Sequence, residues 1–88
     1  MKLDKHVRLV SEQDALFLCK GQEKKYVETE DRYIFQLLEH GRVEDKRLIS
    51  LVAETEKLCE VSADLRLVQI ALEYGNYLAP VDDQIIDI

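Results

Sequence analysis

SADLRLVQIALEYGNYL, from Ser62 to Leu78, is apolar around most of a helical circumference. Between Asp64 and Tyr77, the polar side chains Arg66, Gln69 and Glu73 recur at i, i+3 and i+7, and therefore form one narrow stripe on a helix. Leu65, Leu67, Val68, Ile70, Ala71, Leu72 and Tyr74 fill the other positions. A surface helix in a small domain needs only one apolar face. The second face predicts a binding partner, and we expect that partner to be a peptide.

The size and composition of the chain predict one compact domain. Eighty-eight residues leave no room for a second core, and 47% apolar residues are too many for an intrinsically disordered chain. No apolar run approaches the roughly 20 residues of a membrane span, and the N-terminus lacks the hydrophobic segment of a signal peptide. We therefore expect a cytoplasmic protein with no membrane partner. We assign residues 1–80 to the domain and expect the acidic tail, residues 81–88, to be flexible.

Charge and side-chain chemistry exclude several classes of function. The net charge of −6 and the scattered basic residues argue against nucleic acid as a partner. Cys19 and Cys59 stand in separate segments, with only His6 and His40 as companions, so no zinc site or catalytic thiol is indicated. No paired carboxylates, Ser/His arrangement or phosphate-binding loop is visible. We predict a protein that is not an enzyme and that uses no metal and no cofactor.

The first third of the chain predicts a three-stranded antiparallel sheet. Residues 5–10 alternate between apolar and polar side chains, residues 11–14 form a polar turn, and residues 15–19 are a continuous apolar run. Gly21-Gln22 suits a type II′ turn, which would place Phe17 opposite Tyr26 and Lys20 opposite Glu23. The third strand, residues 24–28, is then an open edge to which another strand can add.

Three helices are predicted after the sheet. The first runs from an N-cap at Thr29 to about His40 and is closed by Gly41. The second spans residues 44–59. The third is capped by Ser62 and ends at Gly75-Asn76. We assign Leu65 and Val68 to the core, where they would pack with Leu72 on the first two helices. Leu67, Ile70 and Tyr74 would then line a groove beside the sheet; the alternative is that the sheet packs across these three residues and makes them part of the core.

The order of three strands and three helices resembles a winged helix-turn-helix domain of the α+β class. More specifically, the chain resembles the PqqD-like family of precursor-peptide recognition elements. Three segments carry this resemblance. Residues 26–28 together with 33–41 are similar to the family's third strand, first helix and closing glycine. Residues 43–49 are similar to the start of its second helix, and residues 63–78 to its third helix.

This resemblance implies a function in the biosynthesis of ribosomally made, modified peptides. In such domains the leader of a precursor peptide lies as an added strand along the third strand, in a groove closed by the third helix, and a separate enzyme modifies it. Carried over to this chain, the backbone would be offered by Lys24, Lys25, Tyr26, Val27 and Glu28. Side-chain contacts would come from Arg66, Leu67, Ile70, Ala71 and Tyr74.

Two alternatives from other classes remain. A winged helix-turn-helix DNA-binding regulator would insert its third helix into the major groove, but that helix offers only Arg66 and Gln69 as DNA-reading groups, flanked by Asp64 and Glu73. A homo-oligomeric adaptor would pair the same edge and apolar helix with a second copy. We expect a monomer or a weak homodimer.

Overall fold

The computed structural model describes residues 1–80 and has an α+β fold, in which a three-stranded antiparallel sheet is followed by three helices. The strands are β1 (Val7–Glu12), β2 (Ala15–Lys20) and β3 (Glu23–Tyr26), in the spatial order β1-β2-β3. The predicted α+β class, the order of three strands followed by three helices, and the central position of the second strand are confirmed. The predicted flexible tail, residues 81–88, lies outside the described residues.

Two tight turns set the register of the sheet. Gly21 has a φ of +60°, as the first position of a type II′ turn requires, and Phe17 pairs with Tyr26 and Lys20 with Glu23 as predicted. The β1–β2 turn is shorter than expected. Gln13 and Asp14 both have positive φ, which is the type I′ geometry, so β1 extends through Ser11 and Glu12.

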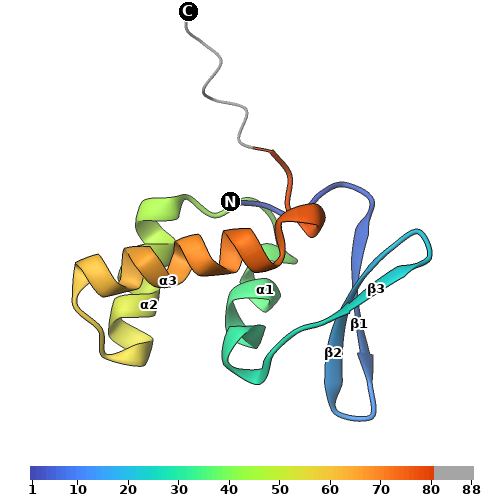
Figure 1. The fold of residues 1–88 in the computed structure, drawn as a ribbon, viewed down its shortest axis with the longest axis horizontal. Coiled ribbons are helices and arrows are strands. Elements are labelled where there is room, and N and C mark those ends of the chain that lie inside the picture. Colours follow the sequence, from blue (N-terminus) through green and yellow to red (C-terminus); the bar gives the residue numbers. More distant parts are fainter. Residues whose placement is uncertain (81–88) are drawn as a thin grey trace, which may run out of the picture.

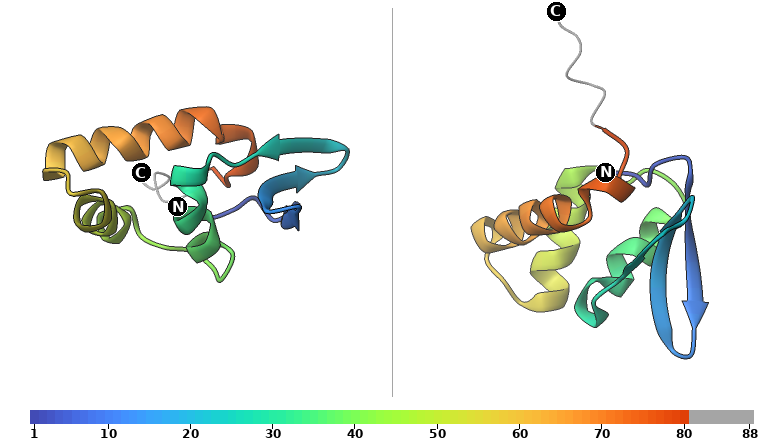
Figure 2. Two further views of the ribbon diagram at one scale, coloured as in Figure 1. Left: turned by 90° about the horizontal axis from the view of Figure 1, so that it is seen from below. Right: turned by 45° about the vertical axis from the view of Figure 1, so that its right-hand side comes forward.

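The helical part begins with a 3₁₀ turn, η1 (Thr29–Asp31), that leads into α1 (Arg32–Leu38). It continues with α2 (Asp45–Glu56), α3 (Glu60–Glu73) and a second 3₁₀ turn, η2 (Gly75–Tyr77). Figure 1 shows α3 crossing in front of α1 and α2, with the sheet to one side. The two views of Figure 2 place α1 between α2 and the sheet.

Helix boundaries differ from the prediction at two caps. Thr29 begins the 3₁₀ turn instead of capping a helix with its side chain. Ser62 lies inside α3, because Lys57 adopts a left-handed conformation with a φ of 56° and ends α2 three residues before the expected position. The chain then turns through Leu58, and α3 begins at Glu60 with Cys59 at the cap.

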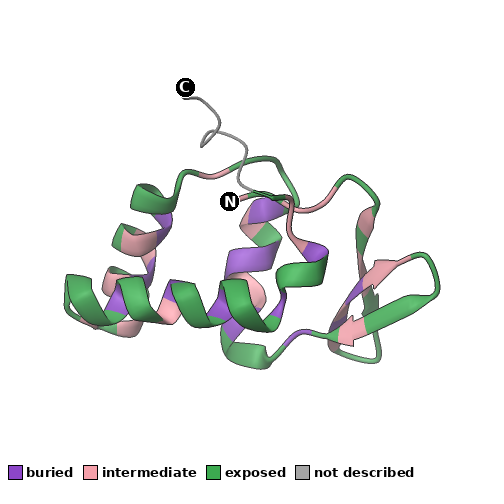
Figure 3. Cartoon of the chain, turned by 45° about the horizontal axis from the view of Figure 1, so that its top comes forward, coloured by how far each residue is buried: buried purple, intermediate pink, exposed green. Residues whose placement is uncertain are grey.

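The core lies where the sheet, α1 and the inner faces of α2 and α3 meet. Its buried apolar residues are Leu16, Leu18, Val27, Ile34, Phe35, Leu38, Leu48, Val52, Ala63, Leu67, Ile70, Tyr74 and Tyr77. In Figure 3 these buried positions face inward, and the outer side of α3 is exposed. The N-terminal segment closes the domain, because Leu3 forms a β-bridge with Leu78 and the Asp4 N–H donates to the Tyr77 carbonyl at 3.0 Å.

Candidate functional site

A buried carboxylate, Asp31, joins α3 to the start of α1. The residue is 3% exposed, and its carboxylate accepts hydrogen bonds from Tyr74 Oη at 2.6 Å and from Arg66 Nη2 at 2.6 Å. A buried charge is tolerated only when it is paired and hydrogen-bonded. Because Arg66 and Tyr74 both belong to the α3 segment, Asp31 fixes the position of that helix beside β3 and η1.

Glu56, near the end of α2, extends this network. It accepts hydrogen bonds from Arg66 Nε at 3.0 Å and from Tyr33 Oη at 2.9 Å. Burial, followed by the hydrogen bond to Glu56, raises the pKa of Tyr33 to about 12. Burial lowers the pKa of Arg66, but the hydrogen bonds to Glu56 and Asp31 outweigh it and raise that pKa. Arg66 is therefore a structural cation that links all three helices.

On the outer edge of β3, two residues have backbone N–H and C=O groups that point away from β2. The Val27 N–H donates to the Leu16 carbonyl at 2.8 Å, so this pair faces inward toward β2. Antiparallel pairing alternates along a strand, and Lys25 and Glu23 therefore also bond toward β2. The N–H and C=O groups of Lys24 and Tyr26 point the other way. Within residues 1–80, β3 has no neighbouring strand on that side.

The free edge ends at Glu28, because its N–H donates to Tyr74 Oη at 3.1 Å. Tyr74 therefore both accepts from the chain that leaves β3 and donates to Asp31. Burial, and then the hydrogen bond to Asp31, raises the pKa of the Tyr74 phenol, which keeps it protonated and able to donate.

Side chains of opposite charge bridge β3 and α3. Lys25 Nζ lies 3.6 Å from Glu73 Oε2 and 5.4 Å from the centre of the Tyr74 ring. Both charged side chains are more than a third exposed, so the ion pair is worth only about 0–1 kcal/mol.

The opposite face of the sheet carries an aromatic pair, of which Phe17 is half-buried and Tyr26 is exposed. Phe17 and Tyr26 make an edge-to-face contact with ring centres 5.8 Å apart, and Tyr26 is 41% exposed. Lys24 lies over the Phe17 ring at 4.4 Å and reaches Glu12 on β1 at 2.7 Å. Apolar and charged groups thus lie beside the free backbone of β3.

The structure divides the predicted site residues into two groups. Lys24, Lys25, Tyr26 and Glu28 lie at the edge and are at least partly accessible, and Ala71 is exposed on α3. Leu67, Ile70 and Tyr74 are 4% or less exposed, Val27 is fully buried, and Arg66 is occupied by Asp31 and Glu56. Leu67, Ile70 and Tyr74 therefore fill the domain's own core and do not line an open groove.

The two apolar faces of α3 are the reverse of those expected. Leu65, Val68 and Leu72, predicted to pack on the first two helices, are 60%, 48% and 79% exposed. That prediction is wrong. The face with Ala63, Leu67, Ile70 and Tyr74 turns inward because it carries the small alanine and the tyrosine whose hydroxyl reaches Asp31. In the sequence, Asp31 is indistinguishable from an ordinary acidic residue in a first turn, so no sequence signal distinguished the two faces.

Cys59, at the start of α3, makes a polar contact with Ser62 outside this network. Cys59 is exposed and its Sγ lies 3.3 Å from Ser62 Oγ, and hydrogen bonds to the Ser62 hydroxyl and backbone lower the pKa of the thiol. Among residues 1–80, no three His, Cys, Asp or Glu side chains lie close enough together to hold a metal ion. No helix in this range is long and apolar enough to cross a membrane.

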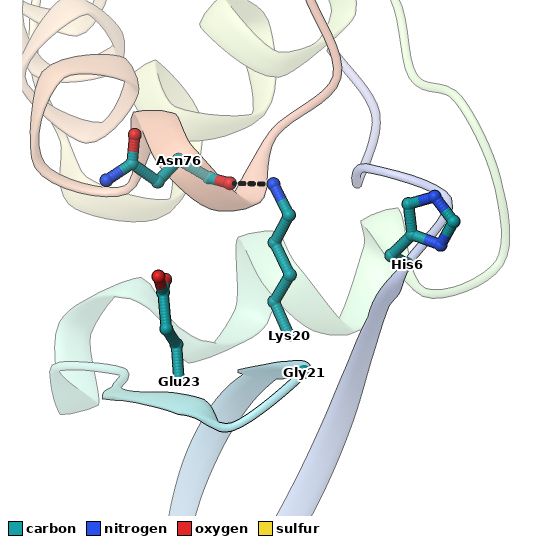
Figure 4. A pocket seen from close by; sticks show the side chains of 5 residues that line it. All are labelled: His6, Lys20, Gly21, Glu23 and Asn76. Atoms are coloured by element: carbon teal, nitrogen blue, oxygen red, sulfur yellow. Dashed lines mark hydrogen bonds between the residues drawn. The ribbon is translucent and has the colours of Figure 1, made fainter.

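A pocket lies at the end of β2 that leads into the β2–β3 turn. It is lined by His6, Lys20, Gly21, Glu23 and Asn76 (Figure 4). Lys20 Nζ donates to the Asn76 carbonyl at 2.9 Å and to Asp4 Oδ2 at 3.5 Å. Its charge is therefore already satisfied by the protein.

Comparisons with known proteins give no relative: no family model, no curated protein and no solved structure matches this chain.

Proposed function

We propose that this protein is a non-catalytic peptide-binding module that captures an extended peptide as an added strand on β3. The observation that carries the proposal is the pair of outward-facing backbone units at Lys24 and Tyr26, next to α3. Strand addition to an open sheet edge is a common mode of peptide recognition, in which main-chain hydrogen bonds align the guest.

The main chain alone does not supply the affinity. Two residues offer up to four hydrogen bonds, each worth about 1 kcal/mol net. Association costs about 4–15 kcal/mol of lost freedom, so side-chain contacts have to supply the remainder. Successive guest side chains would alternate between the Tyr26 ring on one face and the Lys25–Glu73 pair on the other. A guest with an aromatic or aliphatic residue at one position and a charged residue at the next fits this edge.

The class of guest comes from the resemblance to the PqqD-like family. It makes the bound segment the leader of a ribosomally made precursor peptide, and it makes the protein a carrier that presents this leader to a separate modifying enzyme in the cytoplasm. In this proposal the protein needs no cofactor, and it acts only by holding and positioning its guest.

The DNA-binding alternative receives less support from the geometry of α3. The exposed face of that helix carries large aliphatic side chains, and its arginine is tied to Asp31 and Glu56. Phosphates attract clustered Lys and Arg. The described face of α3 offers aliphatic groups instead.

Proline substitution tests strand addition because it removes single N–H groups. Peptides selected from a displayed library of random 12-residue sequences provide the fluorescent probe. Lys24→Pro removes an N–H that faces outward, so the sheet stays paired, and we expect affinity for the probe to fall at least tenfold. Lys24→Ala is the matched control, because it removes the same side chain and keeps the N–H.

Amide resonances give an independent readout of the same binding event. Bound peptide is expected to slow hydrogen exchange at Lys24 and Tyr26 specifically. If Lys24→Pro, correctly folded, binds the selected peptides as tightly as the parent protein and exchange at these two amides is unaffected, strand addition on β3 is rejected.

A further inference from the structure

An exposed aliphatic stripe runs along the outer side of α3. Val61, Leu65, Val68 and Leu72 are 71%, 60%, 48% and 79% exposed, and they are four of the five large apolar residues that the described part of the chain exposes. At 100° per residue they lie on the side of the helix opposite to the buried residues Ala63, Leu67, Ile70 and Tyr74. The stripe therefore makes no contribution to the domain's own core.

The spacing of the stripe is that of a helix-pairing seam. Steps of four, three and four residues reproduce the a and d positions of a heptad, which face a partner helix in coiled coils. From Val61 to Leu72 the stripe extends about 16 Å, or three turns. The helix continues as regular α-helix over this whole distance.

We propose that this stripe binds the same stripe of a second copy of the protein, with the two α3 helices antiparallel. A two-fold axis between Leu65 and Val68 places Val61 opposite Leu72 of the second copy and Leu65 opposite Val68 of the second copy. Each pair of facing residues across the interface then joins one valine to one leucine, so all the pairs are equal in size. A two-fold interface requires such a self-complementary patch.

The borders of the stripe favour a second copy over a charged partner. The residues that flank the seam are Ser62, Gln69 and Ala71, with Asp64 as the only charge. The two other charged residues in the centre and second half of α3, Arg66 and Glu73, point to Asp31, Glu56 and Lys25 of their own domain. Pairing therefore leaves no buried unpaired charge, and the antiparallel arrangement also opposes the two helix dipoles.

The pairing is expected to be weak. The seam has only four aliphatic side chains per copy. Interfaces that bury less than about 1,200 Å² in total are typically weak or transient, and so short a seam is expected to belong to that class. We expect a dimer that forms at micromolar concentration and dissociates on dilution. The stripe shares no residue with the free edge of β3, so the dimer and peptide capture can each be correct without the other.

Sedimentation equilibrium of residues 1–88 between about 5 µM and 1 mM tests the dimer. Leu65→Glu places two carboxylates beside the symmetry axis and is expected to raise the dissociation constant at least thirtyfold, and Leu72→Glu to raise it at least tenfold. Ser50→Glu, on the exposed side of α2, is the control and should have no effect. Circular dichroism confirms that each variant is folded. A parent protein that stays monomeric at 1 mM, or a dimer indifferent to Leu65→Glu, overturns the proposal.

Disulfide trapping tests the orientation. In a Cys19→Ala, Cys59→Ser background, Leu65→Cys protein is mixed with Val68→Cys protein, oxidised, and analysed by mass spectrometry. Antiparallel pairing predicts that the mixed 65–68 disulfide exceeds either symmetric disulfide at least fivefold. Predominant 65–65 disulfide would indicate parallel helices and would overturn the antiparallel arrangement.

Discussion

Tyr74 Oη donates a 2.6 Å hydrogen bond to Asp31 Oδ2, across 43 residues of sequence, and accepts the N–H of Glu28. One phenol thus connects the end of α3, the start of the helical region and the segment that leaves β3. Since Tyr74 and Asp31 are both buried, this connection is made without competing water.

Replacing this phenol tests its contribution directly. Tyr74→Phe leaves the ring in the core and removes both hydrogen bonds, and we expect the free energy of unfolding to fall by about 2–3 kcal/mol. Urea denaturation measures this loss. Tyr77→Phe is the matched control, since its 3.3 Å bond reaches only the exposed carboxylate of Glu23, and a loss below about 1 kcal/mol is expected. Equal effects of the two variants would contradict the role assigned to Tyr74.

The ion pair between Arg66 and Asp31 gives a second prediction. Arg66→Ala removes the cation from a carboxylate that is 3% exposed, and leaving a buried charge unpaired costs about 3–5 kcal/mol. The double variant Asp31→Asn, Arg66→Ala is expected to recover part of this loss, because the uncompensated charge is gone. A double-mutant cycle by chemical denaturation measures the coupling, and purely additive effects would refute it.

The orientation of α3 predicts unequal effects at two neighbouring leucines. Leu67→Ala creates a cavity in the core and is expected to cost about 2–5 kcal/mol. Leu65→Ala, at a position 60% exposed, is expected to change the free energy of unfolding by less than about 0.5 kcal/mol. Thermal or urea denaturation at low protein concentration keeps self-association out of the comparison. A large loss at Leu65 would mean that this face is packed.

The raised pKa values of Tyr33 and Tyr74 predict weaker stability in alkali. A tyrosine in an unfolded chain has a pKa near 10. Because folding raises the pKa of Tyr33 to about 12, and raises that of Tyr74 as well, both favour the folded state fully below pH 10, and this contribution is lost as the pH rises above 10. Denaturation at pH 8, 10 and 11 should show a steeper decline than in the Tyr33→Phe, Tyr74→Phe variant. If the free energies of unfolding of the parent and the double variant declined in parallel with pH, the contribution assigned to the two tyrosines would be contradicted.

Hydrogen exchange in the free protein tests the edge itself. The Lys24 and Tyr26 amides face away from β2, so we expect them to exchange faster than those of Lys25 and Val27. NMR after transfer into D2O resolves the four sites. Slow exchange at Lys24 and Tyr26 would mean that this edge is already covered.

The sheet was predictable because local rules determine it. Gly21 supplies the positive φ of a two-residue turn, and the turn length then fixes every pair between β2 and β3. The turn between β1 and β2 was predicted too long. Its two residues, Gln13 and Asp14, adopt the left-handed conformation, and the sequence did not indicate this because that conformation is typical of glycine and less common for other residues.

The orientation of α3 was not predictable from its own pattern. Both sides of the helix present four apolar residues at helical spacing, so hydrophobicity alone does not select one. The choice depends on Asp31, which lies far away in sequence and reads as an ordinary acidic residue in a first turn. Long-range polar contacts of this kind leave no periodic signal, and the placement of Leu67, Ile70 and Tyr74 in the core followed only from the three-dimensional structure.

The bond from Glu28 to Tyr74 also limits what β3 can accommodate. Each second residue of a strand faces the same way, so the exposed ladder after Tyr26 would continue at Glu28, but there the phenol already holds the N–H. A chain that pairs with β3 therefore reaches a fixed stop after two rungs. The length of guest strand that can pair with β3 is therefore limited at Glu28. Any longer guest has to leave the sheet at this point and run over the surface of α3 or away from it.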